Sequence, residues 1–209
     1  IKSYVHRKGH FSEGQKRAYE TLLPQFGVVY QEQLKSATDW ADIFGNDNPI
    51  VLEIGCGMGE TTAKIAAQNP NINYIGVEVF TAGVGALLKR IAEYGLTNLR
   101  IIQHDAVEIV RDMIPQGTLV GVHVFFPDPW HKARHHKRRL IQAPFVHELA
   151  LRLKNGGYIH CATEELLKNT DSAQSFIPRP ESRPLTKYEN RGNRLGHGVW
   201  DVLFERKSV

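Results

Sequence analysis

Cysteine is scarce in this sequence. The two cysteines, Cys56 and Cys161, show no C-x-x-C spacing and no obvious metal partners, which excludes a disulfide framework and fits a reduced, cytosolic setting. No apolar run is long enough to cross a membrane, and the first eight residues lack the pattern of a signal peptide. The histidines are scattered without a ligand-like spacing. We therefore expect a cytoplasmic protein with no metal site and no membrane partner.

The composition is that of an ordinary soluble protein with a mild excess of positive charge. Its 209 residues suffice for one domain with a full core, and the formal net charge is +4. We expect a basic N-terminal arm over residues 1–45 and a single domain over residues 46–209. The arm is either a loose tail or a segment that touches a polyanion or folds over a ligand. A short helix is expected within it, from Gly14 to Leu23, stopping at Pro24.

A glycine-rich turn follows the first expected strand, residues 50–52, and leads into a helix. It contains Gly55, Gly57 and Gly59, and glycines let a ligand approach the backbone closely. The third glycine comes one residue too early for the dinucleotide fingerprint. Glu53 would repel a pyrophosphate but suits the ammonium of an amino-acid-like ligand. The pattern resembles the first motif of class I S-adenosylmethionine-dependent methyltransferases; the alternative is a plain glycine turn.

Acids stand at the ends of the next two expected strands. Glu78 follows residues 73–77 and lies about 20 residues past the glycines, the spacing at which an acid meets ribose hydroxyls. It supports a nucleoside ligand without choosing between the two cofactors. Asp105 follows the strand at 99–102 and is either a helix N-cap or a ligand contact. In methyltransferases of the class that the glycine turn resembles, an acid here commonly meets the adenine amino group.

The fourth expected strand, residues 119–125, runs into a turn in which Asp128 stands between Pro127 and Pro129. The two prolines fix the backbone around this carboxylate and allow little helix or strand. Such rigidity at the carboxyl end of a central strand indicates a reactive site, and we expect a catalytic role for Asp128. The alternative is a surface turn in which Asp128 is only a cap.

A basic run comes directly after this turn. From Lys132 to Arg139 the chain has five cations and no acid. Such a run is usually a solvated face, but its position beside the expected reactive site favours phosphate binding. The candidate RNA-binding residues are Arg134, His135, His136, Lys137, Arg138 and Arg139.

Strands and helices alternate through most of the chain, which predicts an α/β fold with a doubly wound, Rossmann-like, mostly parallel sheet. A fifth strand is expected over residues 158–162. After a proline-punctuated loop, residues 186–192 and 199–205 have the pattern of two strands. With the glycines near 196–198 between them, they are expected to pair as an antiparallel C-terminal hairpin.

Together these segments resemble the bacterial tRNA (guanine-N7-)-methyltransferase family over nearly the whole chain. The most specific elements are Pro127-Asp128-Pro129-Trp130 and Thr186-Lys187-Tyr188-Glu189. The resemblance implies a class I methyltransferase that carries a methyl group from S-adenosylmethionine to N7 of a guanine in tRNA, in the family the variable-loop guanine. S-adenosylhomocysteine would be the second product. Whether the protein is a monomer or a homodimer is left open.

The resemblance also implies a role for each candidate residue. The cofactor residues would be Glu53, Gly55, Gly57, Gly59, Glu78, Asp105 and Asp128. The residues that face the guanosine would be Lys132, Thr186, Lys187, Tyr188 and Glu189, and residues 134–139 would hold the RNA. In one place the chain departs from the family, which usually has Thr-Asp-Trp after the fifth strand. Here the chain has Thr163-Glu164-Glu165, so the role of the family's Asp is not assigned to Glu164.

Guanine itself sets the chemistry of the expected reaction. Its N7 is an exposed major-groove acceptor with a lone pair and no proton, so methylation needs no base to create the nucleophile. The protein's task is to align the nitrogen, the methyl carbon and the sulfur. The purine becomes cationic as the methyl group arrives, and Asp128 is expected to stabilise that charge or to hold the base by its donors.

Three other functions remain as alternatives. An NAD-dependent oxidoreductase is disfavoured by the early third glycine and by Glu53. An RNA-binding module without catalysis is disfavoured by the acids at successive strand ends. A methyltransferase for a small molecule or a protein is disfavoured by the basic run.

Overall fold

The computed structural model describes residues 2–4, 10–30, 37–163, 176–194 and 198–207. The strands are β1 Ile50–Ile54, β2 Asn73–Val77, β3 Leu99–Ile102, β4 Leu119–Phe125, β5 Leu153–Thr163, β6 Phe176–Ile177 and β7 Trp200–Glu205. The helices are α1 Glu13–Phe26, α2 Ala37–Phe44, α3 Glu60–Gln68, α4 Thr81–Tyr94, α5 Ala106–Asp112, the 3-10 helix η1 Ala133–Arg138, α6 Ala143–Arg152 and α7 Lys187–Arg194. No helix in these ranges has the length and apolar character needed to span a membrane.

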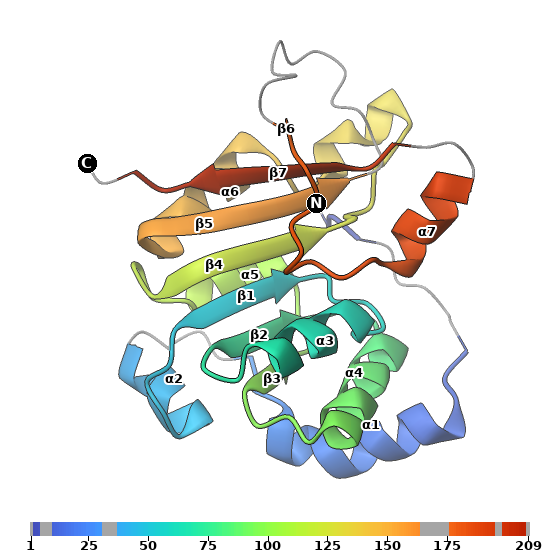
Figure 1. The fold of residues 1–209 in the computed structure, drawn as a ribbon, viewed down its shortest axis with the longest axis vertical. Coiled ribbons are helices and arrows are strands. Elements are labelled where there is room, and N and C mark those ends of the chain that lie inside the picture. The colour runs from blue at the N-terminus through green and yellow to red at the C-terminus, as the bar shows by residue number, and fades with distance from the viewer. Residues whose placement is uncertain (1, 5–9, 31–36, 164–175, 195–197, 208–209) are drawn as a thin grey trace.

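The strands form one sheet with helices on both faces (Figure 1). Its order is β3-β2-β1-β4-β5-β7-β6. Strands β1 to β5 are parallel, and β7 runs antiparallel to β5 and β6. The doubly wound, mostly parallel sheet that the alternation of strands and helices predicts is therefore confirmed.

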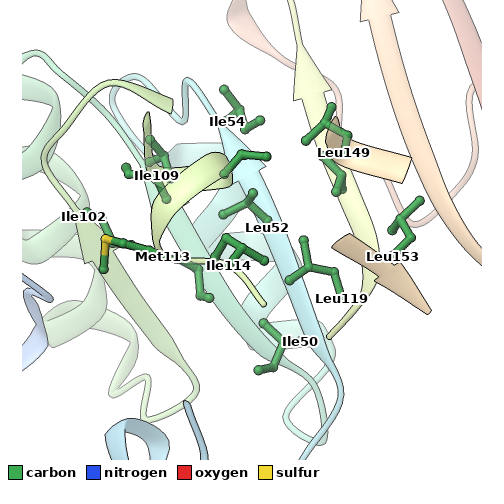
Figure 2. Packing of buried hydrophobic residues seen from close by; sticks show 14 of the residues in the cluster. Ile50, Leu52, Ile54, Ile102, Ile109, Met113, Ile114, Leu119, Leu149 and Leu153 are labelled. Carbon is green, nitrogen blue, oxygen red and sulfur yellow. The ribbon is translucent and has the colours of Figure 1, made fainter. Parts of the chain in front are cut away.

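Two apolar cores, one on each face of the sheet, hold the helices. Side chains alternate along β1, so that Leu52 points to the core covered by α2, α5 and α6 and Val51 to the core covered by α1, α3 and α4. Figure 2 shows the first core, in which Ile109 of α5 and Leu149 of α6 pack against the strands. Because the central strands are buried on both faces, their sequences are nearly continuously apolar.

The helices before β1 belong to these cores. Trp40 of α2 is fully buried in the first core, and α1 packs along α4. The expected stop at Pro24 is wrong, because α1 continues to Phe26. A proline this close to a helix end removes only one N–H donor, and the packing of Leu23 and Phe26 against the second core outweighs that loss. The division of the chain into an arm over residues 1–45 and a following domain stays a prediction.

The strand order reverses between β1 and β4. From β1 the chain leads through α3 to β2 on one side, whereas β4 leads to β5 on the other. Ile54 and Val124 are register partners, so the glycine turn after β1 and the Pro-Asp-Pro turn after β4 leave the sheet at the same edge. Ligands of open α/β sheets bind outside the carboxyl ends of the strands at such a reversal.

The expected strand over residues 186–192 is wrong, because this segment lies in α7. Oγ1 of Thr186 accepts the backbone N–H of Glu189 at 3.0 Å and so caps the helix. Thr186 and Glu189 are buried while Lys187 and Tyr188 are exposed, a spacing of three that suits a helix and not a strand. The sequence Thr-x-x-Glu is a capping-box signal that could have predicted this helix.

The antiparallel C-terminal edge itself is confirmed, with β7 paired to β5 and β6. The partner that the sequence proposed for β7 is replaced by Phe176 and Ile177 of β6, which come from the proline-punctuated loop. Residues 196 and 197 of the expected hairpin turn lie outside the described residues, as does Glu164.

Candidate functional site

The turn between β1 and α3 is a backbone cradle made by glycine. Gly55 and Gly57 have φ of 73° and 55°, and a side chain at either position would point into open space within the described part of the chain. A Cβ at Gly59 would instead come within 2.7 Å of the Leu87 Cβ in α4. The first two glycines therefore leave room for a ligand at the backbone, and the third lets α4 pack against the turn.

Glu78 holds this cradle from the end of β2. One carboxylate oxygen accepts the N–H of Gly57 at 2.7 Å, and the other accepts the N–H groups of Val79 and Phe80 at 2.8 and 2.9 Å. The buried carboxylate is thus fixed by backbone donors beside the turn. The ribose contact that the sequence predicts for Glu78 stays a prediction.

Glu53 lies under the same turn with one carboxylate oxygen unsatisfied. Thr62 Oγ1 donates to Oε1 at 2.8 Å, whereas Oε2 is buried and has no hydrogen-bond partner among the described residues. Burial raises the pKa of Glu53 to about 7, against the opposing effect of the Thr62 hydrogen bond. Burial of a carboxylate without a cation is unfavourable. An ammonium or another donor would satisfy this oxygen, and the cofactor contact that the sequence predicts for Glu53 stays a prediction.

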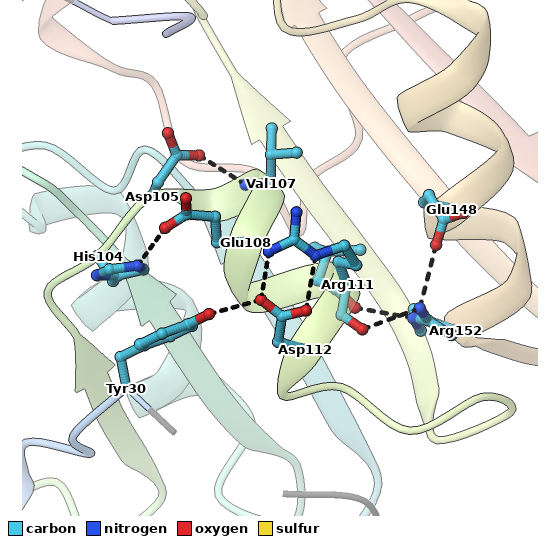
Figure 3. Close-up of polar contacts among 10 residues, drawn as sticks. Tyr30, His104, Asp105, Val107, Glu108, Arg111, Asp112, Glu148 and Arg152 are labelled. Atoms are coloured by element: carbon cyan, nitrogen blue, oxygen red, sulfur yellow. Dashed lines mark hydrogen bonds and ion pairs between the residues drawn. The ribbon is translucent and has the colours of Figure 1, made fainter. Parts of the chain in front are cut away.

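Asp105 caps α5 at the end of β3. Its Oδ1 accepts the N–H of Val107 at 2.9 Å (Figure 3). The capping alternative is therefore confirmed, and the adenine contact stays a prediction. Beside it the His104 ring stacks on Tyr30 with centroids 3.8 Å apart, and His104 Nε2 lies 2.5 Å from Glu108. The stack of Tyr30 on His104 ties the segment before β1 to this edge of the sheet.

The Pro-Asp-Pro turn after β4 is bounded by two strained residues. Phe126 and Trp130 have φ of 52° and 48°, in the left-handed region that non-glycine residues rarely adopt. The N–H of Phe126 donates to the carbonyl of Ala162 in β5 at 2.8 Å, which fixes the start of the turn. Asp128 is half-buried between them. Backbone strain of this kind is found at functional sites, which supports Asp128 as the reactive carboxylate.

The basic run forms η1, and its members divide into two groups. The exposed group consists of Lys132, Arg134, His136 and Lys137. Arg138 instead lies 3.8 Å from the centroid of the Trp130 ring. Arg138 also donates to the carbonyls of Lys2 and Tyr4. The N-terminal segment thus lies against one side of the run.

The remaining two members of the run also face the turn. Arg139 Nε donates to the carbonyl of Pro129 at 2.9 Å. The His135 ring meets the Trp130 ring edge-on with centroids 5.7 Å apart. Arg138, Arg139 and His135 therefore brace the turn, and the exposed group is the part of the run that is open to an anion.

Two residues of the Thr-Lys-Tyr-Glu segment face outward. Lys187 Nζ lies 3.2 Å from a carboxylate oxygen of Glu60, the first residue of α3. The Tyr188 side chain is 61% exposed, and its ring stacks beside Phe126 with centroids 6.2 Å apart. The structure therefore brings Lys187 and Tyr188 to the glycine turn and the Pro-Asp-Pro turn, while the Thr and Glu of the segment turn inward.

A buried charge network, which the sequence reasoning missed, joins this segment to the sheet. Arg183 donates to Asp201 of β7 at 2.6 and 2.7 Å and to Glu189 of α7 at 2.8 Å. Asp201 also lies 2.7 Å from His160 Nε2 of β5. Burial alone would raise the pKa of Asp201, but the hydrogen bonds from His160 and Arg183 lower it. The available signal was a carboxylate inside the apolar strand 199–204.

The arrangement of strands, cradle and turn is that of a class I methyltransferase. A family model described as "Putative methyltransferase" matches residues 47–202. The solved 16S rRNA methyltransferase KamB is 17% identical with a TM-score of 0.58, covering 84% of this chain and 96% of that chain. A 16S rRNA (adenine(1408)-N(1))-methyltransferase from Catenulisporales acidiphilia is 18% identical with a TM-score of 0.56, covering 83% and 92%. These likenesses show the fold.

Curated relatives give the narrower assignment. The tRNA (guanine-N(7)-)-methyltransferase of Dechloromonas aromatica is 60% identical, covering 100% of this chain and 89% of its own length. That of Bordetella pertussis is 55% identical, covering 99% and 85%. The chain belongs to the tRNA (guanine-N(7)-)-methyltransferase family, as the motifs in its sequence indicate.

Proposed function

We propose that this protein transfers a methyl group from S-adenosylmethionine to N7 of a guanine in tRNA, giving 7-methylguanosine and S-adenosylhomocysteine. The observation that carries the proposal is the match of the entire chain to a tRNA (guanine-N(7)-)-methyltransferase at 60% identity. We further infer that the guanine lies in the variable loop and, because tRNA is the substrate, that the protein works in the cytoplasm.

The residues around the glycine turn fit S-adenosylmethionine. When bound, this cofactor supplies an activated methyl group on a sulfonium. The open backbone at Gly55 and Gly57 admits it, and the orphaned Oε2 of Glu53 would accept a hydrogen bond from its amino group. Glu78 would bind the ribose hydroxyls, and Asp105 the adenine amino group.

The side chains at the Pro-Asp-Pro turn would bind and orient the guanine. N7 already carries a lone pair, so no residue has to remove a proton, and alignment is the main catalytic task. The exposed Tyr188 ring beside Phe126 offers a flat surface for the base, with Lys187 next to it. Asp128, held stiffly in its strained turn, stabilises the positive charge that develops on the purine. Thr186 and Glu189 act from inside by shaping α7.

The exposed part of the basic run would hold the RNA backbone. Arg134 and Lys137 stand on the surface next to the Pro-Asp-Pro turn, so phosphates could be bound while a base reaches the turn. Lys132 is exposed at the end of the turn, where it would face the guanosine. Arg138 and Arg139 contribute less directly, because their guanidinium groups already contact Trp130 and Pro129.

The test is methyl transfer to an unmodified tRNA transcript with S-adenosylmethionine that carries a radiolabelled methyl group. The product is then mapped by borohydride and aniline cleavage, which cuts RNA at 7-methylguanosine. We expect one labelled site, at a variable-loop guanine, and no labelling of a transcript in which that guanine is changed to adenine. Transfer to a small molecule or a protein but not to tRNA, or labelling at another base atom, would contradict the proposal.

A further inference from the structure

Arg183 is the centre of a buried network that spans three elements. Its side chain is 1% exposed, and its guanidinium lies between two carboxylates, that of Asp201 in β7 and that of Glu189 in α7. Nε and Nη2 bind the two oxygens of Asp201, which is the bidentate geometry that an Arg fork provides. His160 of β5 binds the same Asp201 carboxylate and extends the network into the sheet.

The guanidinium also contacts the end of β4. Its central carbon lies 5.8 Å from the centroid of the Phe125 ring and 5.7 Å from that of Phe126. Phe126 is the strained residue that opens the Pro-Asp-Pro turn, and its ring also stacks with that of Tyr188 in α7. Arg183 is therefore in contact with both parts of the expected guanine site, the turn that carries Asp128 and the helix that carries Tyr188.

The glycine turn is held independently of this network. Glu78 and its backbone donors lie within the segment from β1 to α4. Among the described residues, α7 meets this segment through the ion pair of Lys187 with Glu60, in which the Lys187 side chain is 81% exposed. Exposed ion pairs contribute little to the stability of a structure. A change at Arg183 should therefore leave the glycine turn as it is.

We propose that Arg183 is a positioning residue for methyl transfer: by binding Asp201 of β7 and Glu189 of α7 while contacting Phe126, it fixes the Pro-Asp-Pro turn and α7 relative to each other. It does so without touching substrate or cofactor. Glu189, which the family resemblance assigns to the guanosine, then acts through Arg183. This inference rests on the proposed methyl transfer to tRNA.

The decisive variant is Arg183→Lys, which keeps the charge but loses the fork that grips two carboxylates. We expect single-turnover transfer at saturating cofactor and tRNA to slow by about ten- to a hundredfold, the scale of a misplacement of about 1 Å at a reactive site. Affinities for S-adenosylmethionine, by calorimetry, and for tRNA, by filter binding, should stay within about a factor of two. Asp201→Asn should give the same pattern, and the double variant should be clearly less than additive.

A readout independent of activity is hydrogen exchange. The amides of Phe126 and Asn190, which bond to Ala162 and Thr186, should exchange faster in Arg183→Lys. The Gly57 amide, bonded to Glu78, should not change.

Arg152→Lys is the matched control. Arg152 is also buried, and its guanidinium binds Glu148 and the carbonyls of Val110 and Arg111 at the other end of the sheet (Figure 3). The Arg152→Lys variant loses the same guanidinium fork at a place that contacts neither the Pro-Asp-Pro turn nor α7. Its transfer rate should therefore equal that of the wild type.

Three results would overturn the inference. One is a normal rate with normal exchange at Phe126 in Arg183→Lys, or in Asp201→Asn if the Lys variant does not fold. Another is an equal loss of rate in Arg152→Lys, which would mean general destabilisation. The third is a loss of tRNA affinity with a flatter salt dependence, which would mean that Arg183 binds phosphate. If the wild-type protein methylates no tRNA, the proposed function is wrong. The hydrogen-exchange result then still tests whether Arg183 fixes the turn and α7.

Discussion

The two halves of the site are built in different ways. In the cofactor half, residues 53–59 with Glu78, a carboxylate binds three backbone N–H groups within one strand–turn–helix–strand unit. In the substrate half, residues 126–130 with 183–189, side-chain charges and rings from β4, β5, β7 and α7 are brought together by Arg183. The first half is fixed by local backbone geometry, whereas the second exists only once the whole sheet has formed.

If the substrate half performs the chemistry, its largest effect should come from Asp128. Asp128→Asn keeps the shape of the turn and removes the charge. We expect single-turnover transfer at saturating cofactor and tRNA to slow by on the order of a hundredfold or more, because one preorganised electrostatic partner is lost. Rapid-quench methyl transfer measures this rate, and a filter-binding titration should show little change in tRNA affinity, since phosphates dominate it.

A near-normal rate with Asn at this position would leave Asp128 as a structural turn residue. Poor cofactor binding combined with a normal saturated rate would move Asp128 into the cofactor half.

The cofactor half should reveal its unsatisfied carboxylate through pH. The pKa of Glu53 is raised to about 7 in the folded protein from 4.5, so the folded state binds the extra proton between these values. Stability is therefore lost as pH rises from about 4.5 through 7, by up to about 3 kcal/mol. The free energy of unfolding of Glu53→Gln, measured with urea and compared with that of the wild type, should therefore rise by about this amount between pH 5 and pH 8.

The matched control for this experiment is Glu93→Gln. Glu93 is an exposed carboxylate on α4. The difference in unfolding free energy between Glu93→Gln and the wild type should therefore be nearly the same at pH 5 and pH 8. If the difference in unfolding free energy for Glu53→Gln is equally independent of pH, burial does not destabilise the ionised Glu53 carboxylate, or a donor satisfies it.

The independence of the cofactor half can be tested with Glu78→Ala. This change removes the charged acceptor beside the glycine turn, and we expect S-adenosylmethionine affinity to fall by roughly ten- to a hundredfold, or about 1.5–3 kcal/mol. The transfer rate at saturating cofactor and the tRNA affinity should stay close to the wild type. Calorimetry measures the affinity, and an unchanged value in a folded variant would remove the ribose role of Glu78.

The smallest expected effect concerns the basic run. Neutralising the exposed pair, Arg134→Gln with Lys137→Gln, should reduce the log–log salt slope of tRNA binding by roughly 0.7–0.9 for each lost phosphate contact. The matched pair, Arg138→Gln with Arg139→Gln, should reduce it less, because these groups brace Trp130 and Pro129. Equal slopes in both double variants and the wild type would place the RNA elsewhere.

The sequence predicted most of the sheet and the cofactor half because their signals are local. Apolar runs, the glycine spacing and Glu78 at a strand end all follow from one strand–turn–helix–strand unit, and the structure brings them together as expected. The capping role of Asp105 was also among the alternatives, since it depends on the next two residues alone.

The substrate half was predicted less well because its partners come from distant elements. The pattern of residues 186–192 suggested a strand, but Thr186 caps a helix here and Glu189 is buried against Arg183. No local pattern pairs Arg183, which precedes α7, with Asp201 of β7, or His160 of β5 with the same carboxylate. Such contacts depend on the order of β5 and β7 in the sheet, which periodicity does not determine.

The central claim is that the site only has to align a guanine N7 that is already nucleophilic. The most direct test is a tRNA assembled with 7-deazaguanosine at the methylated position, where a C–H replaces the N7 lone pair and the rest of the base is kept. The account predicts that this tRNA binds and competes like the normal substrate but receives no methyl group at that residue. Methyl transfer to the 7-deazaguanosine at a rate comparable to that with guanosine would contradict it.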